Sequence, residues 1–145
     1  MQLDFWQLSR DPVERVVALI AERTRSAGEK LLVVADEEAQ RASLSQSLWE
    51  AKPEAFLANG EASAPRAARQ PILLSAACEP ANGAKYVVLA DGTWREGAEA
   101  FERAFLLFGD AAVDGARAVW RQFDGREDVE RSYYAQEDGK WARKA

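Results

Sequence analysis

Residues 31–35, Leu-Leu-Val-Val-Ala, form a continuous apolar run that is followed at once by the acidic residues 36–38. A strand that is covered by helices on both faces has this composition, which is typical of the inner strands of a parallel sheet. The run therefore predicts an α/β fold. The segments on either side of it are expected to supply the covering helices.

Helical patterns flank this strand on both sides. The helix before it is expected to begin at Pro12, with Asp11 as its cap, and to end at Gly28. Its apolar face is Val13, Val16, Val17 and Ile20. The helix after the strand runs to about Glu50 and is stopped by Pro53.

The rest of the chain adds strands and one more helix. Further strands are expected at residues 3–8, 71–75 and 86–90. Residues 57–70 are rich in small and turn-forming types, which indicates a loop. Residues 105–108, Phe-Leu-Leu-Phe, fit a helix and a buried strand equally well. A last helix is expected to start near Asp110 and to end near Gly125.

The order of these elements predicts a Rossmann-like, three-layer α/β/α fold with a mixed, partly parallel sheet. The 145 residues fit a single domain, 1–145. Within it, residues 126–145 are a candidate for a hairpin appended to the α/β core. The first strand–helix turn, residues 8–12, contains no glycine. The fold is therefore expected to lack a nucleotide-binding Gly-rich loop.

Composition excludes several classes of function. Histidine is absent and Cys78 is the only cysteine, so the commonest general base and metal ligands are missing. We expect no catalytic residue, no metal and no cofactor. The net charge of −5 argues against broad binding of nucleic acid. One cysteine, no secretory signal and no apolar run of membrane-spanning length indicate a cytoplasmic protein with no membrane contact.

Two surfaces attract attention, and each has two interpretations. Trp49 and Phe56 either pack at the edge of the core or form an exposed apolar patch for a partner. Arg117 and Arg121 lie one helical turn apart and flank Trp120. They are either solvated charges beside a core stripe, or a receptor for a carboxylate and an aromatic side chain together.

Several short segments, spread along the whole chain, are informative through their order and their spacing. They are Asp4-Phe5-Trp6-Gln7-Leu8, residues 31–34, Leu48-Trp49 followed by Phe56-Leu57, residues 71–74, 87–89 and 101–103, and Ala116-Arg117 followed by Trp120-Arg121. Together they resemble the chi subunit of bacterial DNA polymerase III, a clamp-loader accessory subunit. The resemblance implies a non-catalytic subunit of a DNA-directed DNA polymerase. It also implies that residues 105–108 form a strand.

The resemblance also implies partners. The main ligand is the acidic C-terminal tail of single-stranded-DNA-binding protein, which ends in Pro-Phe, so that the subunit tethers the replicase and reaches DNA only indirectly. The positions that match the family's tail-binding residues are Arg117, Trp120 and Arg121. Phe108 is expected to line the same pocket. Trp49 and Phe56 match the region that contacts the psi subunit.

Two other functions remain open from the residues alone. The first is a small-molecule or nucleotide-binding α/β domain, with a pocket at the strand ends near residues 9–11. The second is a structural subunit that only assembles with other proteins through Trp49 and Phe56. Replacing Arg117 leaves the function of such a structural subunit intact.

Overall fold

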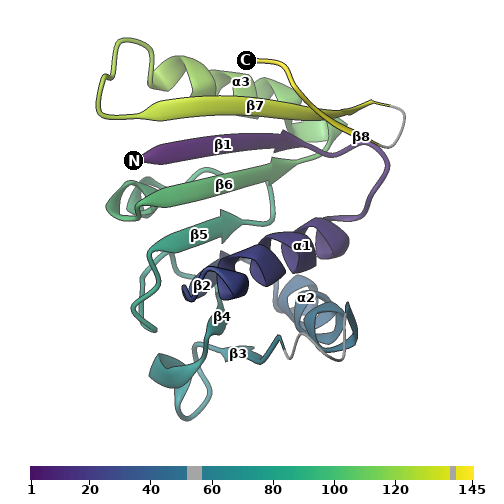
Figure 1. The fold of residues 1–145 in the computed structure, drawn as a ribbon, viewed down its shortest axis with the longest axis vertical. Helices are drawn as coiled ribbons and strands as arrows, with labels where there is room; N and C mark the ends of the chain where they lie inside the picture. Colours follow the sequence, from purple (N-terminus) through teal and green to yellow (C-terminus); the bar gives the residue numbers. More distant parts are fainter. Residues whose placement is uncertain (52–56, 138–139) are drawn as a thin grey trace.

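The computed structural model describes residues 1–51, 57–137 and 140–145 of the chain. In these ranges a single sheet has eight strands in the order β3-β4-β2-β5-β6-β1-β7-β8 (Figure 1). Their bounds are β1 Gln2–Gln7, β2 Leu31–Val34, β3 Asn59–Glu61, β4 Ile72–Ser75, β5 Tyr86–Leu89, β6 Arg103–Phe108, β7 Glu130–Glu137 and β8 Lys140–Arg143. Every neighbouring pair is parallel except β7 and β8, which are antiparallel.

Helices cover both faces of this sheet. Helices α1 (Val13–Ser26) and α2 (Glu38–Ala51) pack on one face, and α3 (Val113–Gln122) packs on the other. Short 3-10 turns lie at Ala67–Arg69, Glu96–Ala100 and Asp110–Ala112. The predicted three-layer α/β/α arrangement with a mixed, partly parallel sheet is confirmed, and all pairs but one are parallel. In the ranges that the structure describes, no helix has the length and apolarity needed to cross a membrane.

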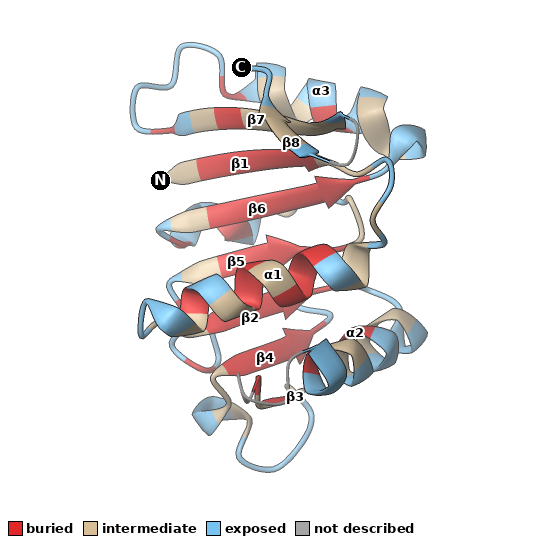
Figure 2. Ribbon diagram, turned by 45° about the vertical axis from the view of Figure 1, so that its right-hand side comes forward, coloured by how far each residue is buried: buried red, intermediate tan, exposed pale blue. Residues whose placement is uncertain are grey.

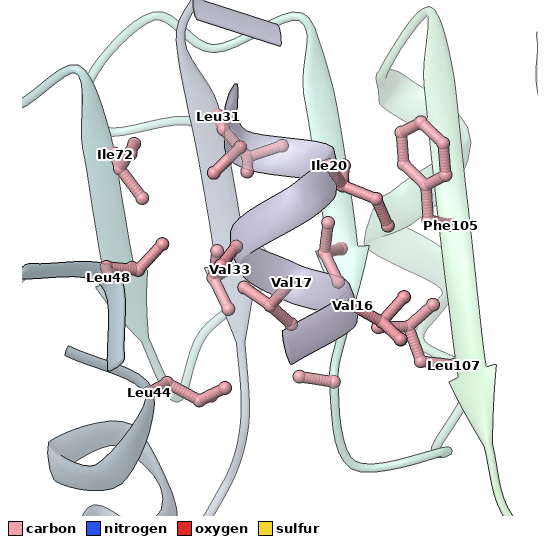
Figure 3. Close-up of a cluster of buried hydrophobic side chains, with 14 of the residues drawn as sticks. Val16, Val17, Ile20, Leu31, Val33, Leu44, Leu48, Ile72, Phe105 and Leu107 are labelled. Carbon is pink, nitrogen blue, oxygen red and sulfur yellow. The ribbon is translucent and has the colours of Figure 1, made fainter. Parts of the chain in front are cut away.

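Strand β2 is buried on both sides, as its apolar composition predicts. Leu31 and Val33 point toward the α1 face, where Val33 lies beside Val17 (Figure 3). Leu32 and Val34 belong to the apolar cluster of the opposite face. All four β2 side chains are shielded from water, which explains why the sequence shows a continuous run here rather than an alternation (Figure 2).

Strand β6 settles the ambiguity at residues 105–108. The strand implied by the family resemblance is confirmed, because Arg103–Phe108 pair in parallel with both β1 and β5. The apolar residues alternate between the two faces, with Phe105 and Leu107 under α1 and Leu106 and Phe108 under α3. In an α-helix these four consecutive residues would instead point in directions about 100° apart around the helix axis.

The prediction of a loop at residues 57–70 is wrong in part, because this segment contains strand β3 and a 3-10 turn at Ala67–Arg69. Asn59 is buried, and its amide nitrogen donates to the backbone oxygen of Leu57 at 2.9 Å. Gly60 lets the Gln70 side chain lie across it, since a Cβ would stand 3.0 Å from Gln70 Cδ. Asparagine and glycine are depleted in strands, so the sequence carries no signal for β3.

The C-terminal segment extends the sheet. Strand β7 pairs with β1 from Gln2↔Glu130 to Gln7↔Ala135, so it lies between β1 and β8. Trp141 of β8 packs edge-on against Trp6 of β1, with ring centroids 4.7 Å apart. Residues from both ends of the chain therefore share one apolar cluster.

Candidate functional site

Helix α3 brings Arg117, Trp120 and Arg121 together on one side, because residues three and four apart are neighbours on a helix. Ala116 and, just beyond the helix end, Phe123 are buried and hold α3 against the sheet. Both arginines are exposed, whereas Trp120 is half-buried between them and the sheet. The sequence-based grouping of the three residues is therefore seen in the structure.

Aromatic and cationic contacts fix the position of Trp120. Its ring centroid lies 5.1 Å from that of Phe5 and 6.1 Å from that of Tyr133. The guanidinium of Arg131 lies 4.5 Å from the Trp120 ring centroid. The same guanidinium donates to the backbone oxygen of Trp120 and, at 2.8 Å, to Asp124. Trp120 thus offers a firmly supported aromatic surface at the margin of α3.

The two α3 arginines carry charge that no described group neutralises. In residues 1–51, 57–137 and 140–145, neither Arg117 nor Arg121 makes an ion pair or a side-chain hydrogen bond. Arg126, just past the helix, is engaged with Glu99 at 3.0 Å and with Asp128 at 2.8 Å. Arginine stays charged at physiological pH, so Arg117 and Arg121 present a permanent pair of cations.

Phe108 lies deeper than expected from the resemblance. Only 2% of it is exposed, and its ring centroid lies 5.8 Å from that of Tyr133. It also lines a cavity of about 450 Å³, together with Asp36 and Asp91, and the lining of that cavity does not include the three α3 residues. Phe108 therefore supports the α3 site through the Tyr133 ring.

Tyr133 is a site residue that the sequence did not identify. Its hydroxyl donates to the side-chain oxygen of Gln7 at 2.7 Å, and its ring stacks on Phe5. Burial raises the pKa of Tyr133, and the charge of Arg117 partly offsets that rise. The adjacent aromatic residues Tyr133 and Tyr134 were visible in the sequence, but nothing local shows which of them faces α3.

Replacing Arg117 with alanine is expected to raise the pKa of Tyr133 further, because the cation that favours the phenolate is removed. Ultraviolet difference titration measures this pKa, with Tyr133→Phe identifying the signal. Arg15→Ala removes an equal charge from α1 and is expected to leave the titration unchanged. An identical titration in Arg117→Ala and the unmodified protein would contradict the placement of Arg117 beside Tyr133.

A second polar cluster lies at the carboxyl ends of β2 and β5. Arg95 donates to Asp36 at 2.8 Å and to both carboxylate oxygens of Asp91 at 2.9 and 2.8 Å. Burial alone would raise the pKa of Asp91, but the hydrogen bonds from Arg95 and from two backbone amides lower it overall. The two carboxylates, held by one arginine, thus join the loop after β2 to the loop after β5. No group of three or more metal-ligating side chains occurs in the described ranges.

The turn between β1 and α1 is filled by a side chain from β7. Gln136 Oε1 accepts hydrogen bonds from the backbone amides of Ser9, Arg10 and Asp11 at 3.1, 3.0 and 3.2 Å. Gln136 Nε2 donates to the Asp11 carboxylate at 2.9 Å. The expected cap of α1 by Asp11 is wrong, because this carboxylate binds Gln136 and α1 has no side-chain cap.

Replacing Gln136 with leucine is expected to lower the free energy of unfolding by about 1–2 kcal/mol, because three backbone amides lose their shared acceptor. Urea denaturation measures the change. Gln46→Leu is the matched control, since Gln46 is exposed and bonds only Glu50 within its own helix; its effect is expected within about 0.5 kcal/mol. Equal stability of the two variants would show that the contact contributes nothing.

The other expected surface is described only in part. Trp49, in the last turn of α2, is 56% exposed and is the one large apolar side chain exposed in the described ranges. Phe56 lies outside the described residues. More than half of Trp49 is thus open to solvent, and the partner-patch interpretation stays a prediction.

The chain matches the model of a known protein family. The family model described as "DNA polymerase III chi subunit, HolC" matches residues 1–128, which is most of the chain and ends before β7 and β8. None of the curated proteins matches the chain. The matched segment includes α3 with its two arginines, Trp120, and the exposed Trp49. The chain therefore belongs to the family of DNA polymerase III chi subunits.

Proposed function

We propose that this protein is a non-catalytic subunit of the DNA polymerase III clamp-loader complex that tethers the replicase to single-stranded-DNA-binding protein. Family membership supports its place in DNA polymerase III. The tether rests on one observation, which is the pair of exposed arginines, Arg117 and Arg121, on either side of Trp120. The ligand is the acidic C-terminal tail of the binding protein, which ends in Pro-Phe.

The chemistry of the α3 site suits such a tail. Arg117 and Arg121 are positioned to donate charge-assisted hydrogen bonds to carboxylates, including the terminal one. The ring of the last phenylalanine can pack edge-on against Trp120, whose own position is held by Phe5 and Tyr133. Because much of this attraction is between exposed charges, binding is expected to weaken as salt is raised.

A fluorescent peptide ending in Asp-Ile-Pro-Phe tests the proposal by titration with the full-length protein. Saturable binding that weakens with salt is expected. A peptide of the same charge that lacks the final phenylalanine serves as the control and is expected to bind much more weakly. Absence of binding to the intact peptide at high micromolar protein would refute the tail-binding function.

Assembly with another subunit through Trp49 is a second function, and the exposure of the Trp49 side chain supports this function. We propose that Trp49, together with Phe56, contacts a psi-like subunit of the clamp loader. Co-purification with that subunit is expected to fail for Trp49→Ala and to survive in Arg117→Ala. The reverse pattern would place the assembly contact on α3.

A nucleotide-binding function has less support. The backbone amides of residues 9–11, where such folds bind phosphate, are already hydrogen-bonded to Gln136.

A further inference from the structure

A cavity of about 200 Å³ lies between α1 and the sheet, on the face opposite α3. Its helical wall is made by side chains between Leu19 and Thr24 of α1, together with Ala27 just beyond the helix end. Its other wall comes from β1, β5 and β6. Among the described residues that line it, none belongs to α3, so this cavity is separate from the proposed tail site.

The walls of this cavity are mostly apolar. Leu19 and Ile20 of α1 line one side, and Phe105 of β6 lines the other (Ile20 and Phe105 in Figure 3). Trp6 of β1 also lines it, with its ring centroid 6.4 Å from that of Phe105. Side chains of this kind gain dispersion contacts with an apolar group placed between them, and that group leaves water at the same time. The walls therefore favour a ligand with an apolar body.

The charged side chains that line the cavity are both arginines. Arg23 is exposed, and within the described ranges neither an ion pair nor a hydrogen bond engages its side chain. Arg103 is held by the fully buried Asp4, which accepts from its Nε at 2.8 Å and from its Nη2. No carboxylate lines the cavity in the part of the chain that the structure describes. The charges therefore favour an anion.

The two arginines suit different parts of the task. The guanidinium of Arg103 also lies 4.7 Å from the ring centroid of Phe105, so it is fixed on two sides before a ligand enters. In residues 1–51, 57–137 and 140–145 its Nη1 has no hydrogen-bond acceptor. Asp4 compensates the charge of Arg103, so Arg23 supplies the net positive charge. One carboxylate thus finds a fixed donor and a free counter-ion at the same cavity.

We propose that this cavity binds a small organic monoanion whose apolar body is about the size of one six-membered ring. The volume sets the body, because a cavity of roughly 150 Å³ accommodates benzene. The cavity of about 200 Å³ has room for such a ring with a carboxylate attached. The unpaired charge of Arg23 sets the head group. This site goes beyond the tethering function and does not depend on it.

Phenylacetate is the probe, and phenylacetamide, which has the same shape without the charge, is the matched control ligand. Titration into the full-length protein, followed by ligand-observed NMR, is expected to give saturable binding of phenylacetate with a dissociation constant on the order of a millimolar. The amide is expected to bind at least about tenfold more weakly, since it forms no ion pair with Arg23. Equal binding of the two ligands, or no saturable binding of phenylacetate up to about 10 mM, would overturn the inference.

Four variants, each checked for folding by circular dichroism, locate the bound probe. Ala27→Phe fills the cavity from an exposed position and Arg23→Gln removes the free cation, so each is expected to weaken phenylacetate binding at least about fivefold. Ala42→Phe, at an exposed position of α2 away from the cavity, is the control and is expected to bind normally. Arg117→Ala/Arg121→Ala is also expected to bind normally, and Arg23→Ala is expected to match Arg23→Gln. Binding that survives Ala27→Phe and Arg23→Gln, or that is lost in the α3 variant, would place the probe elsewhere and refute the site.

Discussion

Replacing Arg117 and Arg121 together with alanine is expected to weaken binding of the acidic tail peptide by at least about 100-fold. Each arginine is expected to donate a charge-assisted hydrogen bond worth roughly 1.5–3 kcal/mol. Two of them amount to at least a hundredfold change, because each 1.4 kcal/mol is about tenfold. The fold is expected to be unaffected, since both side chains are exposed and make no ion pair among the described residues.

The matched control for this variant is Arg15→Ala/Arg23→Ala, in which two exposed arginines of α1 are removed. It has the same net charge as the test variant, so it separates a local contact from general electrostatic attraction. The control is expected to bind with nearly normal affinity. Similar losses in both double variants would mean that the tail senses only overall charge, and that α3 is not its site.

Replacing Phe5 with alanine is expected to lower the free energy of unfolding by about 3–5 kcal/mol. Phe5 lies in β1 and is fully buried. Its ring stacks on Tyr133 and meets Trp120 edge-on, so the substitution leaves a cavity beneath α3. Urea denaturation measures the loss. Tail affinity is expected to fall as well in conditions where the variant is folded, because Trp120 loses its support.

Trp49→Ala is the control for Phe5→Ala. It also removes a large aromatic side chain, but one that is 56% exposed, so its effect on unfolding is expected within about 0.5 kcal/mol. Phe5→Leu keeps most of the buried volume and is expected to cost less than about 1.5 kcal/mol. A loss for Phe5→Ala no larger than that for Trp49→Ala would contradict the central place of Phe5 in the core.

Local patterns predicted the parts of this structure that depend on near neighbours in sequence. The composition of residues 31–35 predicted a doubly covered strand, and the spacing of Arg117, Trp120 and Arg121 predicted that they share one side of a helix. Strand β3 was not predicted from the sequence, because Asn59 and Gly60 are poor strand formers. It is held there by pairing with β4 and by the hydrogen bond from Ser45 to Asn59.

Contacts between distant segments could not be predicted. Tyr133 bonds Gln7, and Gln136 bonds the turn at residues 9–11, across about 125 residues of sequence. Hydrophobic periodicity indicates which face of an element is buried, but it does not indicate which element covers that face. Phe108 shows the same limit. The family resemblance implied its strand, but nothing in the sequence indicated that Phe108 lines a cavity together with Asp36.

The order of the strands sets how far apart two bound partners would sit. Helix α2, with Trp49, lies beside β3 and β4, whereas α3 lies over the end of the sheet formed by β6, β1 and β7. Four strand spacings separate β4 from β1, which is roughly 20 Å. The two surfaces also belong to helices that cover opposite faces of the sheet. Where the two partners belong to one assembly, attachment of the first raises the effective concentration of the second, so that two weak contacts act together as a strong one.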